Sequence, residues 1–155
     1  MEILYIEDVD IKSQVCENIL YQLPDWFGNK QAILDYIEAV KDMIFYAYYE
    51  KNEPIAFIAL KIHNEFMAEI SVMGVLEPFH RKGLGKKLIN ECEKYCRKNN
   101  FEFLTVKTLA DTNPDESYAK TRAFYQAMNF KPLEIFPQIW DENNPCLYMI
   151  KILYF

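Results

Sequence analysis

The sequence VLEPFHRKGLG, residues 75–85, joins a run of strand-forming residues to an amphipathic helical segment. Gly74, Gly83 and Gly85 are three of the chain's four glycines and fall within twelve residues around this junction. Because glycine lacks a Cβ, the loop can turn its amides inward, and a ligand phosphate can approach the free N–H groups at the start of the helix. The junction therefore predicts a binding site for a pyrophosphate.

The local charge at this loop is opposite to that of the whole chain. Arg81, Lys82, Lys86 and Lys87 place four positive charges within seven residues, whereas the formal net charge is −6. A glycine turn followed by an ordinary solvated helix explains the same residues about equally well, because short glycine patterns also arise by chance. A Rossmann-type dinucleotide site is disfavoured, since the G-x-G-x-x-G spacing is absent and no βαβ unit surrounds the loop.

Composition limits the class of protein. With 155 residues and 51% hydrophobic content, the chain can bury a core, and one domain over residues 1–155 is the default at this size. The acidic balance disfavours nucleic acid and anionic membranes, which are captured by fields of Lys and Arg. No apolar run of about 18 residues is present, and the acidic N-terminus lacks a signal pattern. We therefore expect a cytoplasmic protein with no membrane or nucleic-acid partner.

The four cysteines, Cys16, Cys92, Cys96 and Cys146, lie within apolar segments and show no paired framework. This usage suits a reducing compartment, with the thiols as small core side chains. Cys92 and Cys96 share one helical face, but no second pair of ligands accompanies them, so we expect no metal site. Their expected burial also disfavours an acyl-cysteine intermediate.

Hydrophobic periodicity and turn residues predict a mixed α/β chain. Two helices, the first capped by Asp10, precede three successive strands that form an antiparallel meander. The glycine loop then leads into a third helix. The expected strands are residues 3–6, 43–49, 55–62, 66–76, 101–108, 133–136 and 146–153, and the expected helices cover 11–20, 32–40, 88–96 and 117–128.

Two motifs carry a family resemblance. Residues 75–85 resemble the acetyl-CoA-binding motif of the GNAT family of N-acetyltransferases, a strand followed by [Q/R]-x-x-G-x-[G/A] and a helix. Forty residues beyond Gly85, the sequence FYQAMNF, residues 124–130, resembles the family's second signature, F-Y-x-x-x-G-F. The resemblance implies an acyl-CoA N-acyltransferase fold. Its mostly antiparallel twisted sheet has about seven strands, is flanked by about four helices and splays between the fourth and fifth strands.

The resemblance also implies acetyl-CoA as cosubstrate and assigns residues to it. Pantetheine would run beside the strand, with phosphates on the loop amides and Arg122 within reach of a phosphate. Three residues depart from the family pattern: His80 replaces Gln or Arg, Asn129 replaces glycine, and Tyr118 replaces an asparagine whose contact Asn113 could supply. The residues assigned to acetyl-CoA are Met73, Gly74, Val75, His80, Arg81, Lys82, Gly83, Leu84, Gly85, Lys86, Asn113 and Arg122.

Two residues match the family's catalytic positions. Tyr125 matches the tyrosine that protonates the departing thiolate, and a phenol with a pKa of about 10 is protonated at neutral pH. Glu69 resembles the general-base glutamate of the fourth strand, and strand alternation would place it on one face with Met73 and Val75. A carboxylate is a far weaker base than an amine, so burial or a bridging water must assist it. A core aromatic and a solvated carboxylate remain alternative readings of Tyr125 and Glu69.

The acceptor is expected to be a small-molecule or peptide amine. In this architecture the first two helices and their loop would form its site, with Trp26 and Phe27 as the best wall residues and Trp140 as another. Simple loop packing explains these aromatics at least as well. Asp25, Glu69 and Asp141 would make the groove acidic and suited to a cationic amine.

The sequence therefore predicts an acetyl-CoA-dependent N-acetyltransferase that works by direct attack in a ternary complex. A catalytically silent coenzyme A sensor is the alternative favoured by the three departures, and a generic nucleotide-binding domain is a weaker one. The apolar C-terminal strand, ending in ILYF at 152–155, gives a weak prediction of a homodimer formed by pairing of sheet edges.

Overall fold

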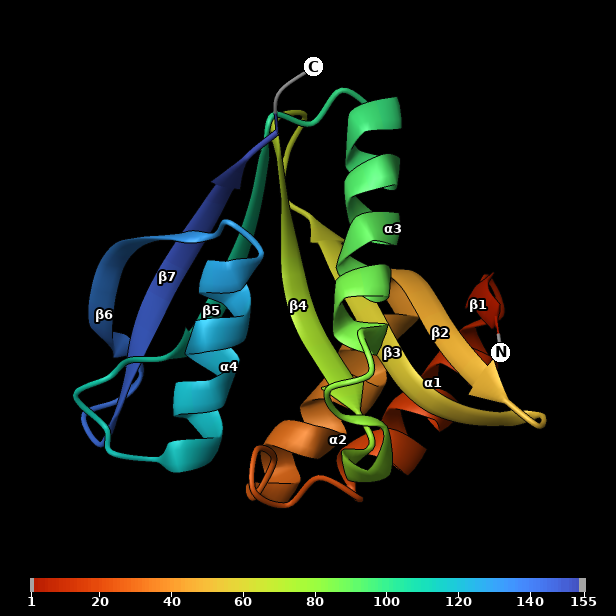
Figure 1. Cartoon of the computed structure of the whole chain (residues 1–155), viewed down its shortest axis with the longest axis horizontal. Helices are drawn as coiled ribbons and strands as arrows, with labels where there is room; N and C mark the ends of the chain where they lie inside the picture. The colour runs from red at the N-terminus through yellow and green to blue at the C-terminus, as the bar shows by residue number, and fades with distance from the viewer. Residues whose placement is uncertain (1, 154–155) are drawn as a thin grey trace.

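The computed structural model describes residues 2–153 and contains a seven-stranded sheet with helices on both faces (Figure 1). The N-terminal half holds β1 (Glu2–Tyr5), α1 (Val9–Leu20), α2 (Lys30–Ala39), β2 (Ile44–Glu50), β3 (Glu53–Ile62) and β4 (Met67–Val75). The C-terminal half holds α3 (Leu84–Lys98), β5 (Phe103–Leu109), α4 (Glu116–Ala127), β6 (Lys131–Asp141) and β7 (Asn144–Ile152). Two 3₁₀ turns, η1 (Val40–Asp42) and η2 (Glu77–Phe79), complete the order.

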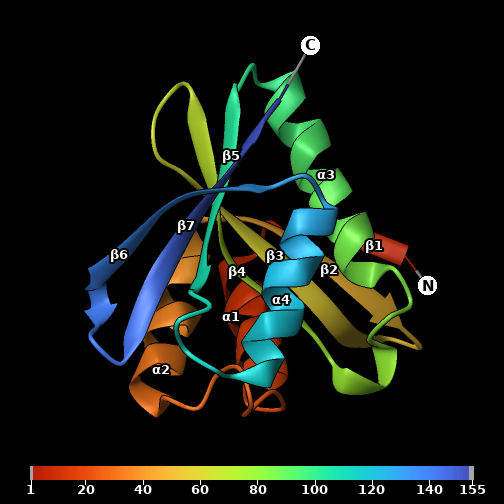
Figure 2. The ribbon, with the colours of Figure 1, turned by 60° about the vertical axis from the view of Figure 1, so that its left-hand side comes forward.

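The strand order is β1-β2-β3-β4-β5-β7-β6, and β4 with β5 is the one parallel pair in the described sheet. This arrangement confirms the predicted fold class. Helices α3 and α4 cover one face of the sheet, while α1 and α2 cover the other (Figures 1 and 2). The sheet therefore has a buried core on each side.

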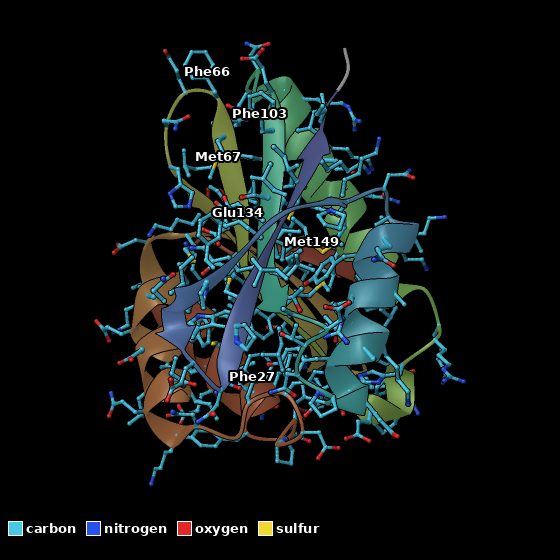
Figure 3. The ribbon with its side chains drawn as sticks, turned by 90° about the vertical axis from the view of Figure 1, so that its left-hand side faces the viewer. Phe27, Phe66, Met67, Phe103, Glu134 and Met149 are labelled. Carbon is cyan, nitrogen blue, oxygen red and sulfur yellow. The ribbon has the colours of Figure 1, made fainter. Side chains whose placement is uncertain are left out.

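Strands β4 and β5 pair over a short length and then separate. Their register runs from Met67 opposite Phe103 to Ile70 opposite Val106, and the remainder of both strands is not paired with the other. Figure 1 shows the two strands diverging below this point, and Figure 3 places Met67 and Phe103 near the paired end, with Phe27 at the opposite end. The predicted splay is present, and it opens toward the α1–α2 loop.

A bulge interrupts β4 just before the splay. Opposite β3, Val72 pairs with Ala59 but Ile70 pairs with Leu60, so Ser71 is an extra residue on β4. Ala68 and Ile70 belong to the core under α3, whereas Val72 belongs to the core under α1. The alternation of side chains is therefore reversed across Ser71.

This reversal corrects one prediction. Regular alternation would place Glu69 on one face with Met73 and Val75, but those two residues pack against the α3 core. Glu69 lies opposite Ala68 and Ile70, on the face covered by α1 and α2. A one-residue bulge has no distinctive sequence pattern here, so the alternation could not reveal it.

The two hydrophobic cores lie on opposite faces of the sheet. One is built by α3, α4 and the strand residues that face them. It includes Leu88 of α3, Leu104 of β5 and Phe130, which follows α4. The other is built by α1, α2 and the opposite faces of β2 and β3, where the rings of Phe45 and Phe57 stack 5.2 Å apart. Both contain side chains that are completely buried, which fixes the helices that frame the splay.

Two details differ from the sequence prediction. The cap of α1 is Asp8, whose carboxylate accepts from the N–H groups of Asp10 and Ile11. Strand β7 lies between β5 and β6, so it is not the free edge expected for dimerisation, and the two edge strands of the described sheet are β1 and β6. Tyr154 and Phe155, the last residues of that expected edge, lie outside the described residues. Within residues 2–153, no helix is long and apolar enough to cross a membrane.

Candidate active site

A cavity of about 740 Å³ opens at the mouth of the splay. One wall is the end of β4 with the loop that follows it, and the opposite wall is the first half of α4. The α1–α2 loop contributes Asp25, Trp26 and Phe27, and the start of α3 contributes Gly83 through Lys86. The α1–α2 loop, the end of β4 and the glycine loop, which the sequence singled out, thus meet around one cavity.

The loop between η2 and α3 exposes the amino end of the helix. Gly83 is the N-cap with φ of +78°, no side chain caps the helix, and the first helical hydrogen bond recorded there is Lys87 N–H to the Gly83 carbonyl. Arg81 also has a positive φ, of 61°. Free amides at a helix amino end carry partial positive charge. With Arg81 and Lys86 lining the same cavity, this end suits a phosphate or pyrophosphate group.

Only Gly83 meets the predicted need for unusual backbone geometry. A Cβ on Gly83 would meet nothing within 4 Å, whereas one on Gly85 would come within 2.9 Å of the Phe124 ring. A Cβ on Gly74 would lie 2.9 Å from Ile19 and 3.2 Å from Leu23 of the α1 segment. Gly74 and Gly85 therefore also allow α1 and α4 to pack closely, while all three glycines line the cavity.

The free edge of β4 faces the cavity with two sets of backbone polar groups. Leu76 N–H donates to the Ile55 carbonyl on β3 at 2.9 Å. Because the backbone groups of a strand alternate in direction, those of Met73 and Val75 point away from β3 and into the splay. Nε2 of His80 donates to the Val75 carbonyl. The neutral ring then has no second N–H to donate to a phosphate.

The α1–α2 loop is hydrogen-bonded to α4 across the cavity. Trp26 Nε1 donates to the Ser117 carbonyl at 3.3 Å, and Tyr118 Oη donates to the Trp26 carbonyl at 2.6 Å. The indole also makes an edge contact with the His80 ring at 5.4 Å. Tyr118 departs from the family pattern, and its sequence context did not indicate this hydrogen bond to Trp26.

Tyr125 is buried on α4 behind the cavity wall. Its ring lies 5.4 Å from that of Phe124 and 5.6 Å from that of Phe130, and 5% of the residue is exposed. Burial raises the pKa of the phenol well above its ordinary value, with smaller contributions from Tyr118 and Tyr36. Within residues 2–153 no hydrogen bond involves this hydroxyl, so its proton is not committed to another acceptor.

Glu69 is buried and paired on both carboxylate oxygens. Oε1 lies 2.6 Å from Nε2 of His63, and Oε2 lies 3.3 Å from Nζ of Lys107 on β5. Lys107 also lies over the ring of Tyr148. Burial, followed by the charge of Glu69, raises the pKa of Tyr36 on α2. Glu69 does not line the cavity, and it stands at the paired end of β4 on the face of α1 and α2.

With this geometry established, the match to a family model is decisive. Residues 15–130 match the model described as the acetyltransferase (GNAT) family. The chain belongs to the GNAT family. It is an acyltransferase of the N-acetyltransferase type that uses acetyl-CoA, as the sequence predicted.

Relatives of this GNAT chain agree with that assignment. An uncharacterised N-acetyltransferase of Chlorobaculum tepidum is 29% identical over 120 residues, which cover 76% of this chain and 69% of the relative. A solved structure of a putative GNAT acetyltransferase from Desulfovibrio desulfuricans matches with a TM-score of 0.82 at 13% identity, over 99% of this chain and 100% of the other. An aminoglycoside 6′-N-acetyltransferase complexed with coenzyme A matches with a TM-score of 0.77 at 16% identity, over 99% and 98% of the two chains.

Several residues assigned from the GNAT pattern lie away from the cavity. Arg122 Nη1 donates to the Leu109 carbonyl at 2.7 Å at the end of β5, and Asn113 Nδ2 donates to the Asn143 carbonyl at 3.0 Å. Lys82 lies over the ring of Phe79. Trp140 is exposed near the end of β6. Nothing in the sequence distinguished these positions from residues that point into the cavity.

The cavity is also lined by α4 residues that were not predicted from the sequence to belong to the site. Ser117, Tyr118, Lys120, Thr121, Ala123 and Phe124 all line it. Most of them recur at intervals of three or four, which is the spacing of one helical face. That spacing was the available signal, but it required knowing which face of α4 turns toward β4.

The cysteines do not form a chemical centre in the described chain. All four are buried, and burial raises the pKa of Cys16 and Cys96 to about 12 and of Cys146 to about 11. Such thiols are poor nucleophiles at neutral pH. Among residues 2–153, no group of three His, Cys, Asp or Glu side chains is arranged to hold a metal ion.

Proposed function

We propose that this GNAT protein transfers the acetyl group of acetyl-CoA to a primary amine by direct attack in a ternary complex. The observation that carries the proposal is the cavity that connects the uncapped amino end of α3 to the free edge of β4. Acetyl-CoA supplies a thioester whose acyl carbon is attacked and whose sulfur leaves. The residues around the cavity fit the separate parts of that molecule.

The start of α3 would hold the phosphates. The N–H groups of Leu84, Gly85 and Lys86 lie in the first helical turn, and Arg81 and Lys86 add positive charge. Backbone groups of Met73 and Val75 would pair with the amides of the pantetheine arm, as an added strand pairs with an open sheet edge. The Val75 carbonyl already accepts from His80, so its N–H is the more available group.

Tyr125 would donate a proton to the leaving sulfur. The raised pKa of the buried phenol keeps its proton in place throughout the neutral range. It also makes complete transfer to a thiolate unfavourable, because the thiol has a pKa of about 8.5. Hydrogen bonding to the developing charge is therefore the main contribution we assign to Tyr125.

Glu69 would accept the proton lost by the amine. The bulge at Ser71 turns Glu69 toward α1 and α2, the side from which the acceptor would enter. Both carboxylate oxygens are already paired, with His63 and with Lys107. Since Glu69 does not line the cavity, a water bridging amine and carboxylate is the most direct connection we propose.

The acceptor site is assigned to the α1–α2 loop, with Trp26 and Phe27 as its wall. Asp25 and Glu77 also line the cavity, and their charges favour a cationic amine. The structural neighbour named for aminoglycosides makes a polyamine or aminoglycoside one candidate, and a peptide amine is the other.

We further propose a single domain, a cytoplasmic location, and no metal, nucleic acid or membrane partner. Any homodimer formed by pairing of sheet edges would use β1 or β6.

The test is a coupled assay that measures free coenzyme A thiol after mixing acetyl-CoA with an amine panel. The panel contains spermidine, kanamycin, lysine and short peptides with free N-termini. Acetylated product of matching mass, formed in proportion to enzyme, supports the proposal. Micromolar binding of acetyl-CoA with no product from any amine supports the coenzyme A sensor instead, an alternative that the Tyr118–Trp26 contact in the cavity keeps open.

A further inference from the structure

Trp26 touches both walls of the cavity. On the β4 side its indole meets the His80 ring edge-on at 5.4 Å, with 76° between the planes. On the α4 side its Nε1 donates to the Ser117 carbonyl at 3.3 Å. One side chain from the α1–α2 loop thus contacts both α4 and the loop between η2 and α3 that carries His80.

Tyr118 completes a second connection at the same place. Its hydroxyl donates to the Trp26 carbonyl at 2.6 Å, so the two segments exchange one hydrogen bond in each direction across 91 or 92 residues of sequence. Burial raises the pKa of Tyr118 to about 12, with smaller contributions from Tyr36 and Asp115. The phenol therefore remains a donor throughout the neutral range.

These contacts continue to the free edge of β4. His80, which meets the indole, donates through Nε2 to the Val75 carbonyl. A chain of contacts thus runs from Val75 through His80 and Trp26 to Tyr118. Val75, His80, Trp26 and Tyr118 all line the cavity, as do Met73 and Gly74 of β4 and the start of α3.

We propose that Trp26 and Tyr118 form a latch across the pantetheine channel, which must open before acyl-CoA binds. The inference rests on the proposed binding of acyl-CoA in this cavity. A pantetheine arm that runs from the α3 amides along β4 must pass the indole, because the indole contacts both sides of that path. Opening the latch also frees the α1–α2 loop, so coenzyme binding would reshape the wall assigned to the acceptor.

The latch predicts binding kinetics that differ from those expected if Tyr118 merely contacted bound coenzyme A. If opening precedes binding, the observed association rate reaches a plateau set by the opening step. Removing the Tyr118 hydroxyl deletes one hydrogen bond of the closed state, which should raise the plateau by roughly 2- to 10-fold. If Tyr118 only contacted the bound ligand, its loss would raise the dissociation rate and leave association unchanged.

The experiment uses the intrinsic fluorescence of Trp26. The chain has two tryptophans, so Trp140→Phe leaves Trp26 as the single reporter. Stopped-flow mixing with unacylated coenzyme A, which permits no turnover, is compared between this protein and the same protein carrying Tyr118→Phe. The matched control is Tyr21→Phe, because Tyr21 is an exposed tyrosine at the end of α1 that does not line the cavity.

The expected result is a saturating rate in the parent, a plateau 2- to 10-fold higher with Tyr118→Phe, and no change with Tyr21→Phe. Equal plateaus in parent and Tyr118→Phe, with binding intact, overturn the latch and leave the proposed function standing. No binding of coenzyme A by the folded parent, checked by circular dichroism, overturns both. A second readout is amide hydrogen exchange of residues 21–29, which should speed up with coenzyme A, and unchanged or slower exchange contradicts the latch.

Discussion

The buried phenol of Tyr125 sets a first prediction at the scale of single residues. Tyr125→Phe keeps the ring packing against Phe124 and Phe130 and removes only the hydroxyl. We expect kcat to fall by about 10²-fold, while the Kd of acetyl-CoA measured by calorimetry stays within twofold of the wild-type value. Full turnover by the variant with its true acceptor would rule out Tyr125 as the acid.

The pH dependence gives a separate check on Tyr125. Because burial raises its folded pKa above the ordinary value of about 10, the phenol loses its proton only above that pH. A fall of kcat between pH 8 and 10 should therefore persist in Tyr125→Phe, since another group causes it. Disappearance of that fall in the variant would show that Tyr125 ionises early.

Glu69 can be tested against a second buried glutamate. Glu69→Gln should lower kcat by about 10²-fold with little change in acetyl-CoA affinity, because the carboxylate lies outside the cavity. Glu93 is the matched control, since it is also buried and ion-paired, with Lys151 and Arg97, but belongs to α3. Glu93→Gln should alter stability and spare kcat. Equal losses of kcat in the two variants would remove Glu69 from the base assignment.

Residue-level prediction from the sequence succeeded where a motif fixed the backbone. The glycine and charge pattern of the loop is local, and His80, Arg81 and Gly83 through Lys86 line the cavity while Lys82 does not. Arg122 and Asn113 do not line the cavity, because each is held by a carbonyl distant in sequence, at Leu109 and Asn143. The face of Glu69 was wrong because the bulge at Ser71 depends on pairing with β3.

At the scale of elements, substitutions at Gly74 and Gly83 distinguish the cost of side-chain crowding from the cost of backbone strain. Gly74→Ala would push a methyl group against Ile19, Leu23 and Phe57, so we expect a loss of about 1–3 kcal/mol in unfolding free energy. Gly83→Ala meets open space but keeps φ at +78°, and we expect a loss of about 1 kcal/mol. Urea denaturation monitored by circular dichroism measures both. A larger loss for Gly83→Ala would contradict the packing role of Gly74.

Element boundaries were predicted to within two residues except at the start of α3 and in β6. The sequence indicated residues 133–136, but the strand extends over Lys131–Asp141. Pro132 and Pro137 suggested breaks, and the register with β7 shifts beside both of them. An edge strand tolerates proline because the missing N–H would have faced solvent. The sequence alone did not show that β6 is an edge strand.

At the scale of the whole molecule, the buried thiols predict an alkaline loss of stability. Burial raises the pKa of Cys16 from 9.0 to about 12, so the unfolded chain releases that proton first. The contribution is complete below about pH 9 and is lost as pH rises toward 12. Each such thiol should reduce the unfolding free energy by up to about 1.4 kcal/mol per pH unit in this range.

Urea titrations at pH 8, 9, 10 and 11 test this linkage. Cys16→Ala removes one thiol and should flatten the decline between pH 9 and 11, even if the variant is less stable at pH 8. The slope difference between wild type and variant is the quantity compared, so a constant offset from the lost side-chain volume cancels. Parallel declines in the two proteins would show that Cys16 does not titrate as described.

The overall architecture followed from the order of elements and two local motifs. The splay itself comes from parallel pairing of β4 with β5 over only four residues of each strand, Met67–Ile70 and Phe103–Val106. Such pairing is non-local and has no marker in either strand. The family resemblance supplied what hydrophobic periodicity could not, while the closure of the cavity by Trp26 and Tyr118 required the structure.

The central claim is that the cavity at the splay binds acetyl-CoA through the amino end of α3. Calorimetric titration of acetyl-CoA into the wild type and into Arg81→Glu/Lys86→Glu tests it most directly, since both side chains line the cavity and their replacement leaves the glycines unchanged. We predict one-to-one binding with a Kd in the range of about 1–100 μM for the wild type and at least tenfold weaker binding for the folded variant. Absence of binding to the folded wild type, or equal affinity in the two proteins, would contradict the account.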